Sequence, residues 1–219
     1  MTPDDACWAA FLAAGHTQPS VDADFSGWHR GRPHFAVWAI ALAAPAIDAR
    51  LASVRRRFDG LLRPDYARQA HVTLHVCGFP CERARWPDDF ARDRLLRQVR
   101  QLAESAVAPF EIALGDIDSF TSAPFFRVED RSGAIARLRH GLAREGGDGR
   151  TTPFLPHVTL GLYNAAHPVA DVERQIGDRR LPPLEAQVRQ IELMAYESAV
   201  LGGPLTTLCR FDLTTRRIV

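Results

Sequence analysis

The chain has 219 residues, 46% of them hydrophobic, and its 27 basic residues nearly balance 26 acidic ones. This length can bury the core of one domain or of two fused lobes. The small net charge excludes the broad basic surface that a long nucleic-acid duplex needs, whereas a nucleotide or a short RNA end needs only a local basic groove. All basic residues are arginine, which together with the many alanines is typical of a GC-rich bacterial genome.

Residues 1–33 are predicted to be an N-terminal extension, and residues 34–219 a single domain. The apolar run at 34–42 predicts a buried strand, and the helical spacing of apolar residues after Pro45 predicts a helix to residue 58. The later elements are, in order, a strand at 71–79, a helix at 95–106, a hairpin of 110–114 and 125–128, a helix at 133–143, a glycine-rich loop at 146–149, a strand at 157–162, a helix at 169–176, and strands at 186–195 and 205–213.

This order of elements describes two similar halves. Each half contains strands, a helix and one strand that carries the same short motif. The arrangement predicts an α+β fold of two lobes, with mostly antiparallel sheets and helices packed outside.

The repeated motif is His-Val-Thr-Leu, which occurs at His71–Leu74 and again at His157–Leu160. In a strand, residues two apart point to the same face, so each copy offers an imidazole and a hydroxyl side by side. His-x-Thr is common by chance, but two copies in matching apolar strands are a specific signal. The ordinary alternative is a pair of half-buried strand histidines satisfied by their neighbours.

Two imidazoles and two hydroxyls suit displacement at phosphorus. One histidine takes a proton from the entering oxygen, and the other gives a proton to the leaving oxygen. We assign His157 as the base and His71 as the acid, although the sequence offers no reason to prefer this order. The hydroxyls of Thr73 and Thr159 would donate hydrogen bonds to the phosphate oxygens.

These motifs resemble those of the 2H phosphoesterase superfamily, and most closely its bacterial branch of RNA 2′,3′-cyclic phosphodiesterases, also called 2′-5′ RNA ligases. The resemblance runs from about residue 34 to residue 213, and it includes the proline before the second motif. It implies two sheets that face a central cleft lined by both motifs, and metal-independent chemistry on 2′,3′-cyclic or related nucleotide phosphates. The family often has an aromatic residue after a glycine turn near the end, which Gly202–Thr206 lacks.

Four further residues are candidates for lining the cleft. His75 would share the face of His71 and Thr73, but Gly161 stands at its position in the second copy. Trp38, Phe126 and Tyr163 are candidates for stacking on a base, although a core position is the more ordinary role for each. No metal site is expected. Histidines four residues apart, such as His71 and His75, can bind one metal ion together only on a helix, and the residues around them favour a strand.

We therefore expect a cytoplasmic, cofactor-free and monomeric enzyme that opens 2′,3′-cyclic phosphates of nucleotides or single-stranded RNA ends. We expect no membrane partner, because no stretch approaches the roughly 20 apolar residues of a membrane span. One alternative is the hydrolysis of another cyclic or 2′-5′-linked nucleotide phosphate by the same histidines. Another is a nucleotide- or RNA-binding protein that keeps the cleft without turnover.

Overall fold

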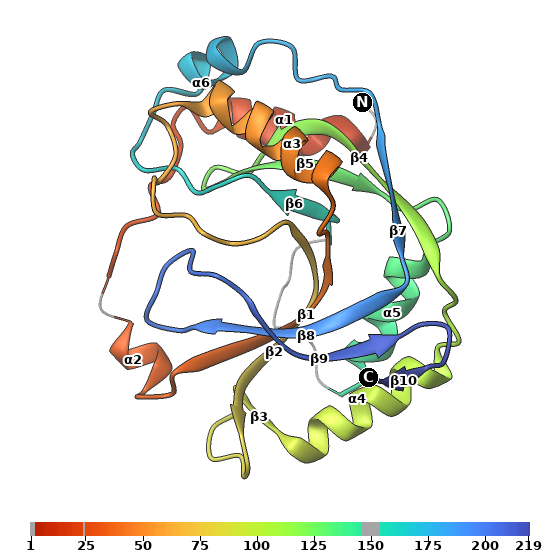
Figure 1. The fold of residues 1–219 in the computed structure, drawn as a ribbon. Helices are drawn as coiled ribbons and strands as arrows, with labels where there is room; N and C mark the ends of the chain where they lie inside the picture. The colour runs from red at the N-terminus through yellow and green to blue at the C-terminus, as the bar shows by residue number, and fades with distance from the viewer. Residues whose placement is uncertain (1–2, 24, 146–153) are drawn as a thin grey trace.

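The computed structural model of the chain describes residues 3–23, 25–145 and 154–219, so the predicted loop at 146–149 lies outside the described residues. The strands form two sheets in two lobes (Figure 1), which confirms the predicted α+β class. The order in the six-stranded sheet is β10 (Arg217–Ile218), β9 (Thr206–Asp212), β8 (Gln190–Glu197), β1 (His34–Ala41), β2 (His71–Cys81) and β3 (Asp89–Ala91). The order in the four-stranded sheet is β6 (His157–Thr159), β5 (Pro124–Glu129), β4 (Phe110–Ser119) and β7 (Leu184–Val188).

Strand β1 lies at the centre of the larger sheet, paired antiparallel with β2 and β8. Its sequence is apolar on both faces because both faces are covered. Trp38 and Ile40 belong to the large core cluster on the helix side, whereas Val37 and Ala39 belong to a small cluster on the other side. Among the described strands, only β2 and β3 pair in parallel.

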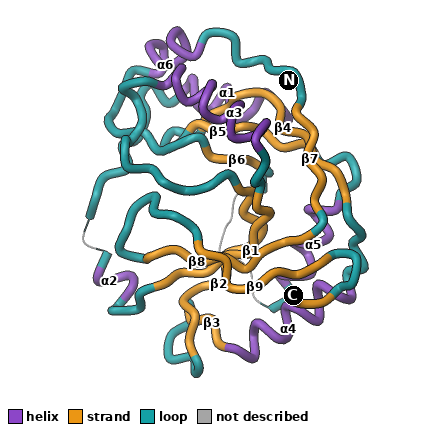
Figure 2. The backbone as a smooth tube through the Cα atoms, viewed as in Figure 1, coloured by secondary structure: helices purple, strands orange, loops and turns teal. Residues whose placement is uncertain are grey.

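The helices lie on the outer sides of the two sheets (Figures 1 and 2). Helix α3, which follows a strand of the larger sheet, lies beside the smaller sheet with α1 and α6. Helix α5, which follows a strand of the smaller sheet, packs instead on β2 and α4. This exchange ties the two lobes together. The helices are α1 (Pro3–Ala13), α2 (Ser26–His29), α3 (Pro45–Arg55) with a 3₁₀ turn η1 (Arg56–Phe58), α4 (Arg92–Glu104), α5 (Ala134–Ala143) and α6 (Val169–Ile176).

The predicted single strand at 186–195 is wrong, because the chain changes sheets within it. Residues 184–188 form β7 beside β4, and residues 190–197 form β8 between β1 and β9. Arg189 connects them, and its carbonyl oxygen accepts a hydrogen bond from the backbone of Leu213 at 3.0 Å. The apolar pattern runs through both strands, so it does not reveal where one sheet ends and the other begins.

The N-terminal segment packs against the smaller sheet. Helix α1 contacts β4 and α6, and Phe11 is 1% exposed within the large core cluster. The backbone of Ser20 donates a hydrogen bond to the carbonyl oxygen of Tyr163 at 2.9 Å. The division between residues 1–33 and 34–219 stays a prediction, and the side chains of α1 contribute to the core of the second part.

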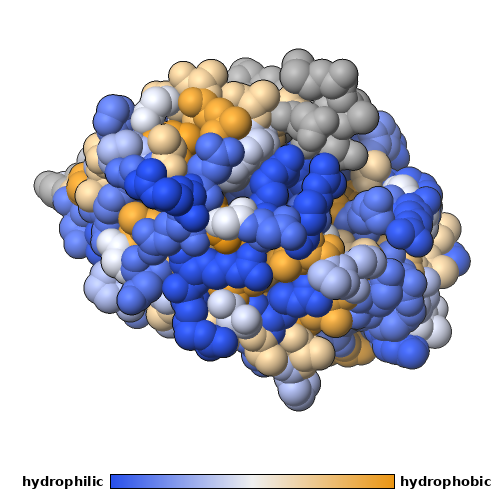
Figure 3. All heavy atoms as spheres, turned by 90° about the horizontal axis from the view of Figure 1, so that it is seen from above, coloured by the Kyte–Doolittle hydropathy of each residue, from blue (hydrophilic) through white to orange (hydrophobic). Residues whose placement is uncertain are grey.

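The outer surface over the upper helices is mainly hydrophilic, with small apolar areas between the polar side chains (Figure 3). This agrees with amphipathic helices whose apolar sides face the core, as in α6, where Val169, Val172 and Ile176 are buried. Among the described helices, none combines the length and the apolar character that crossing a membrane requires.

Candidate active site

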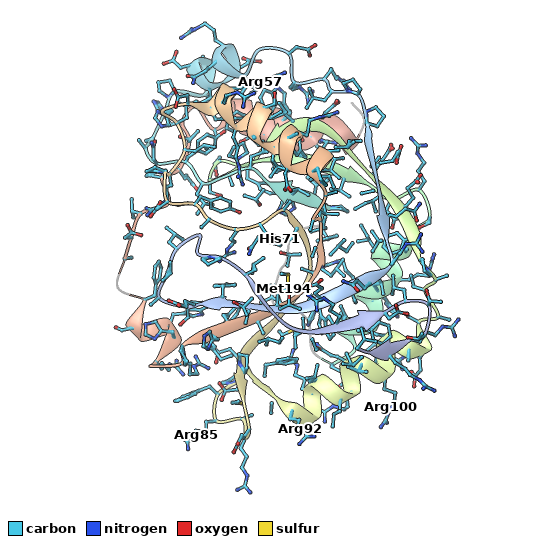
Figure 4. All side chains as sticks on the ribbon, in the orientation of Figure 1. Arg57, His71, Arg85, Arg92, Arg100 and Met194 are labelled. Atoms are coloured by element: carbon cyan, nitrogen blue, oxygen red, sulfur yellow. The ribbon has the colours of Figure 1, made fainter. Side chains whose placement is uncertain are left out.

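The two motif strands lie side by side although they belong to different sheets. Strand β6 is the edge of the smaller sheet, and it contacts β2. Strand β3 pairs only with residues 79–81 of β2, so the motif half of β2 is also an edge. Figure 4 shows His71 in the middle of the molecule, between the two layers of sheet. An electrostatic effect of His157 is the smallest of the contributions that act on the pKa of His71.

The ring of His71 is held in one tautomer. Its Nδ1 donates a hydrogen bond to the carbonyl oxygen of Gln69 at 2.8 Å, because a carbonyl can only accept. The other nitrogen, Nε2, is left with a lone pair. Burial lowers the pKa of His71 to about 4, with smaller contributions from the charges of Arg68 and His157, against the effect of the Gln69 hydrogen bond. His71 is therefore neutral at pH 7.

His157 is held in the same way. Its Nδ1 donates to the carbonyl oxygen of Leu155 at 2.7 Å, again two residues before the histidine. The half-buried ring lies against two aromatic rings, with centroids 5.1 Å from Phe120 and 5.2 Å from Phe125. A backbone carbonyl two residues upstream thus fixes the direction of each ring.

The motif threonines lie on the same strand faces as their histidines. On β2, Thr73 pairs with Ala39 and His71 pairs with Ala41, two positions of β1 that share a face. Both threonines are partly exposed. The side chain of Thr159 shares a hydrogen bond with the hydroxyl of Tyr66, and burial raises the pKa of that tyrosine. The sequence analysis did not identify Tyr66, because it lies in an irregular segment without a motif.

His75 does not share the face of His71, and this prediction is wrong. The register of β2 against β1 shifts at Leu74, because Trp38 pairs with His75 whereas Ala39 pairs with Thr73. Such a β-bulge places two successive side chains on one side of the sheet. His75 therefore turns toward the core beside Trp38, and it is only 2% exposed.

The three aromatic candidates do not line the cleft either, since Trp38, Phe126 and Tyr163 are each 0% exposed. The indole nitrogen of Trp38 donates to Gln98 Oε1 at 2.9 Å, and the Tyr163 hydroxyl lies 2.9 Å from Ser119 Oγ. These polar ends are satisfied inside the protein, as buried aromatic side chains require. The core interpretation holds for all three residues.

A buried ion pair lies next to the second histidine. Arg127 stands opposite His157 in the pairing of β5 with β6. Its guanidinium contacts one carboxylate oxygen of Asp118 through Nε at 2.7 Å and through Nη2 at 2.6 Å. Asp118 is 0% exposed and also accepts the backbone N–H of Ser119 at 2.7 Å. The first motif has no corresponding pair among the described residues.

A cavity of about 490 Å³ adjoins the first motif. It lies between the end of α3, the segment before His71, and strands β8 and β9. Met194 forms part of its wall and lies near the centre of the molecule in Figure 4. Within the described part of the chain, no three side chains of His, Cys, Asp or Glu are grouped to hold a metal ion.

Comparison with known proteins places this arrangement in a family. Residues 43–199 match the model of the 2′-5′ RNA ligase superfamily. TT0787 of Thermus thermophilus is 23% identical, with a TM-score of 0.55 over 82% of this chain and 97% of that chain. LigT of E. coli in its apo form is 18% identical, with a TM-score of 0.50 over 84% of this chain and 99% of that chain.

The sequence matches none of the curated proteins with which it was compared. At these identities the solved structures show a common fold, whereas the family model covers most of the chain. The resemblance inferred from the two motifs is thereby confirmed. The chain belongs to the 2′-5′ RNA ligase superfamily, the 2H phosphoesterases.

Proposed function

We propose that the protein hydrolyses 2′,3′-cyclic phosphates of nucleotides or RNA ends by two-histidine acid–base catalysis. One observation carries the proposal: His71 and His157 sit on adjacent strands, and each donates Nδ1 to a carbonyl two residues upstream. The two imidazoles would then flank one phosphorus. Because these groups supply both proton transfers, the reaction needs no metal ion.

In the proposed reaction, a water oxygen bonds to phosphorus while its proton passes to one imidazole. The bond from phosphorus to one ribose oxygen breaks, and that oxygen takes a proton from the other imidazole. The product is a phosphate monoester with a free neighbouring hydroxyl. The hydroxyls of Thr73 and Thr159 would donate to the non-bridging oxygens, where charge builds up.

The environment of His71 favours roles opposite to those that we assigned from the sequence. Since burial lowers its pKa to about 4, His71 is neutral at pH 7 and suits the base that accepts the proton of water. His157, which is half-buried, then starts as the protonated acid. A bound phosphate would favour the state in which the two rings together carry one proton. The two histidines would therefore titrate as a coupled pair.

We infer the substrate class from the family to which the chain belongs, and not from a contact with a bound ligand. LigT of E. coli, at a TM-score of 0.50, has been crystallised in complex with NADP+. A nucleotide ligand in this chain is therefore part of the proposal. Hydrolysis of another cyclic or 2′-5′-linked nucleotide phosphate would use the same two histidines, and only a panel of substrates separates these activities. The cytoplasmic location and the monomeric state stay predictions.

The test is hydrolysis of nucleoside 2′,3′-cyclic monophosphates in the presence of EDTA. We expect wild-type turnover to survive chelation, and His71→Ala and His157→Ala each to lower it about 10²–10⁴-fold. His34→Ala is the matched control, because this exposed histidine lies on β1 and in neither motif. Turnover close to the wild-type rate in either motif variant would refute the mechanism. Tight binding of a nucleoside monophosphate without turnover of any cyclic substrate would instead indicate a binding protein.

A further inference from the structure

Two arginines beside the motifs have no acidic partner among the described residues. Arg55, at the end of α3, donates from Nε to the carbonyl oxygen of Leu160 at 2.7 Å. Its Nη2 is buried and makes no hydrogen bond within the described chain. Arg68 donates from Nε to the carbonyl oxygen of Gly203 at 3.3 Å and stacks on Tyr196 at 4.0 Å. Both guanidinium charges are therefore uncompensated.

Both arginines line the cavity of about 490 Å³. This cavity adjoins both motifs, because Gln69 and Ala70 in its wall directly precede His71, and the Leu160 carbonyl bound by Arg55 directly follows Thr159. The charge of Arg68 also acts on the ring of His71. The two guanidinium groups therefore lie beside the segments that carry both motifs.

The acidic side chains of this cavity do not form ion pairs with Arg55 or Arg68. Glu192 is engaged by the Nε of Arg210 at 3.2 Å and by the hydroxyl of Thr207. Asp48 lies two helical turns before Arg55, roughly 10 Å along the helix axis, and it is exposed. The end of the cavity nearest the motifs is therefore positive, and its free donors suit an anion.

A second cavity, of about 310 Å³, is lined by Leu155 and by residues of β4 and β5, and it is also rich in arginine. Three of its four arginines have carboxylate partners, since Arg127 contacts Asp118, Arg131 contacts Glu129 and Arg180 contacts Asp116, and the fourth, Arg179, lies over the ring of Trp8. An added anion there would have to compete with these carboxylates. The comparison favours the cavity of Arg55 and Arg68 as the anion site.

We propose that Arg55 and Arg68 form a second phosphate subsite, which binds a further phosphate of the molecule whose cyclic phosphate lies between the histidines. The inference rests on the proposed function and narrows its substrate class. The preferred substrate is a cyclic phosphate joined through its nucleoside to another phosphate, as at the end of an RNA chain or in a 5′-phosphorylated nucleotide. An unphosphorylated nucleoside cyclic phosphate would fill only half of the site.

Binding measurements test the subsite without any need for turnover. Titration calorimetry compares adenosine 2′,5′-bisphosphate with adenosine 2′-monophosphate, and the corresponding 3′ isomers with each other. We expect the wild-type protein to bind one bisphosphate at least tenfold more tightly than its monophosphate. Arg55→Gln and Arg68→Gln should bring this ratio close to one. Arg56→Gln is the matched control, because Arg56 is the next residue after Arg55, is exposed and does not line the cavity.

The same ratio can be measured in catalysis, with kcat/KM for adenosine 2′,3′-cyclic phosphate and its 5′-phosphorylated form. A loss of preference in either arginine variant, but not in Arg56→Gln, supports the subsite. Equal binding of both ligands by the wild-type protein, or a ratio unchanged in both variants, overturns it. If the wild-type protein turns over neither substrate but keeps the arginine-dependent preference in binding, the proposed function fails while the subsite stands.

Discussion

The two motif regions share four residues but differ in their surroundings. His71 lies in a long strand and is 8% exposed. Gln69, two residues before it, is hydrogen-bonded to Leu205 in the connection between β8 and β9. His157 lies in a strand of three residues, is half-buried, and has two aromatic rings and the Arg127–Asp118 pair beside it. Identical backbone anchors thus orient both rings, while burial lowers the pKa of His71. A duplicated motif can in this way supply two unlike catalytic groups.

The largest expected effect comes from removing both histidines. His71→Ala and His157→Ala should each lower kcat about 10²–10⁴-fold. The double variant should lose little more than either single variant, because the two proton transfers belong to one reaction. The measurement is single-turnover hydrolysis of a nucleoside 2′,3′-cyclic phosphate. Multiplicative losses in the double variant would mean that the two rings act independently, contrary to the shared site.

The second effect is on the free energy of unfolding. It concerns the buried Arg127–Asp118 pair, which lies only beside the second motif among the described residues. Asp118→Asn leaves the charge of Arg127 without its buried carboxylate, so we expect a loss of about 3–5 kcal/mol in the free energy of unfolding. Asp116→Asn is the control on the same strand. Its partner Arg180 is well exposed, and a pair of this kind is worth about 0–1 kcal/mol. Urea unfolding measures both, and equal losses would show that burial of the Asp118 pair is unimportant.

The third effect depends on pH and concerns the first motif region. Since the pKa of His71 is lowered to about 4 from 6.5, the unfolded chain binds this proton more strongly than the folded protein. The contribution of His71 to the free energy of unfolding is fully present above pH 6.5. It is lost as the pH falls toward 4, by about 3 kcal/mol at most. His71→Asn should flatten this part of the stability profile.

The pH dependence of kcat/KM tests which of the two histidines is the base. If His71 is the base, the acidic limb of kcat/KM lies well below pH 6.5, because His71 stays neutral there. An acidic limb at or above pH 6.5 would restore the assignment made from the sequence, with His157 as the base. Calorimetric titration of the wild-type protein and the His71→Asn variant provides an independent check on the same proton.

The order of elements predicted the fold class, and the resemblance to the 2H phosphoesterases implied that both motifs line one cleft. It could not place His75, since the bulge at Leu74 depends on the register against β1. It also missed Arg55, Arg68 and Tyr66. These residues lie at a helix end and in an irregular segment, and only tertiary packing carries them to the motif strands.

The smallest expected effect concerns the anchor of the first ring. The side chain of Gln69 bonds to the backbone of Leu205 in both directions, accepting at 2.9 Å and donating at 3.1 Å, while its own carbonyl orients His71. Gln69→Ala removes both side-chain bonds, each worth about 1 kcal/mol, and should lower kcat severalfold through a looser ring.

Because the backbone carbonyl of residue 69 remains in this variant, KM and the fold should change little. Gln187→Ala is the control, since this glutamine also bonds through its side chain, to Glu111, but on the strand of the smaller sheet farthest from β6. The measurement is kcat and KM for a nucleoside 2′,3′-cyclic phosphate, with thermal unfolding alongside. If Gln69→Ala lowers the melting temperature but leaves kcat at the wild-type value, the clamp between residue 69 and Leu205 supports only the fold, and the backbone carbonyl alone aims the ring of the first motif.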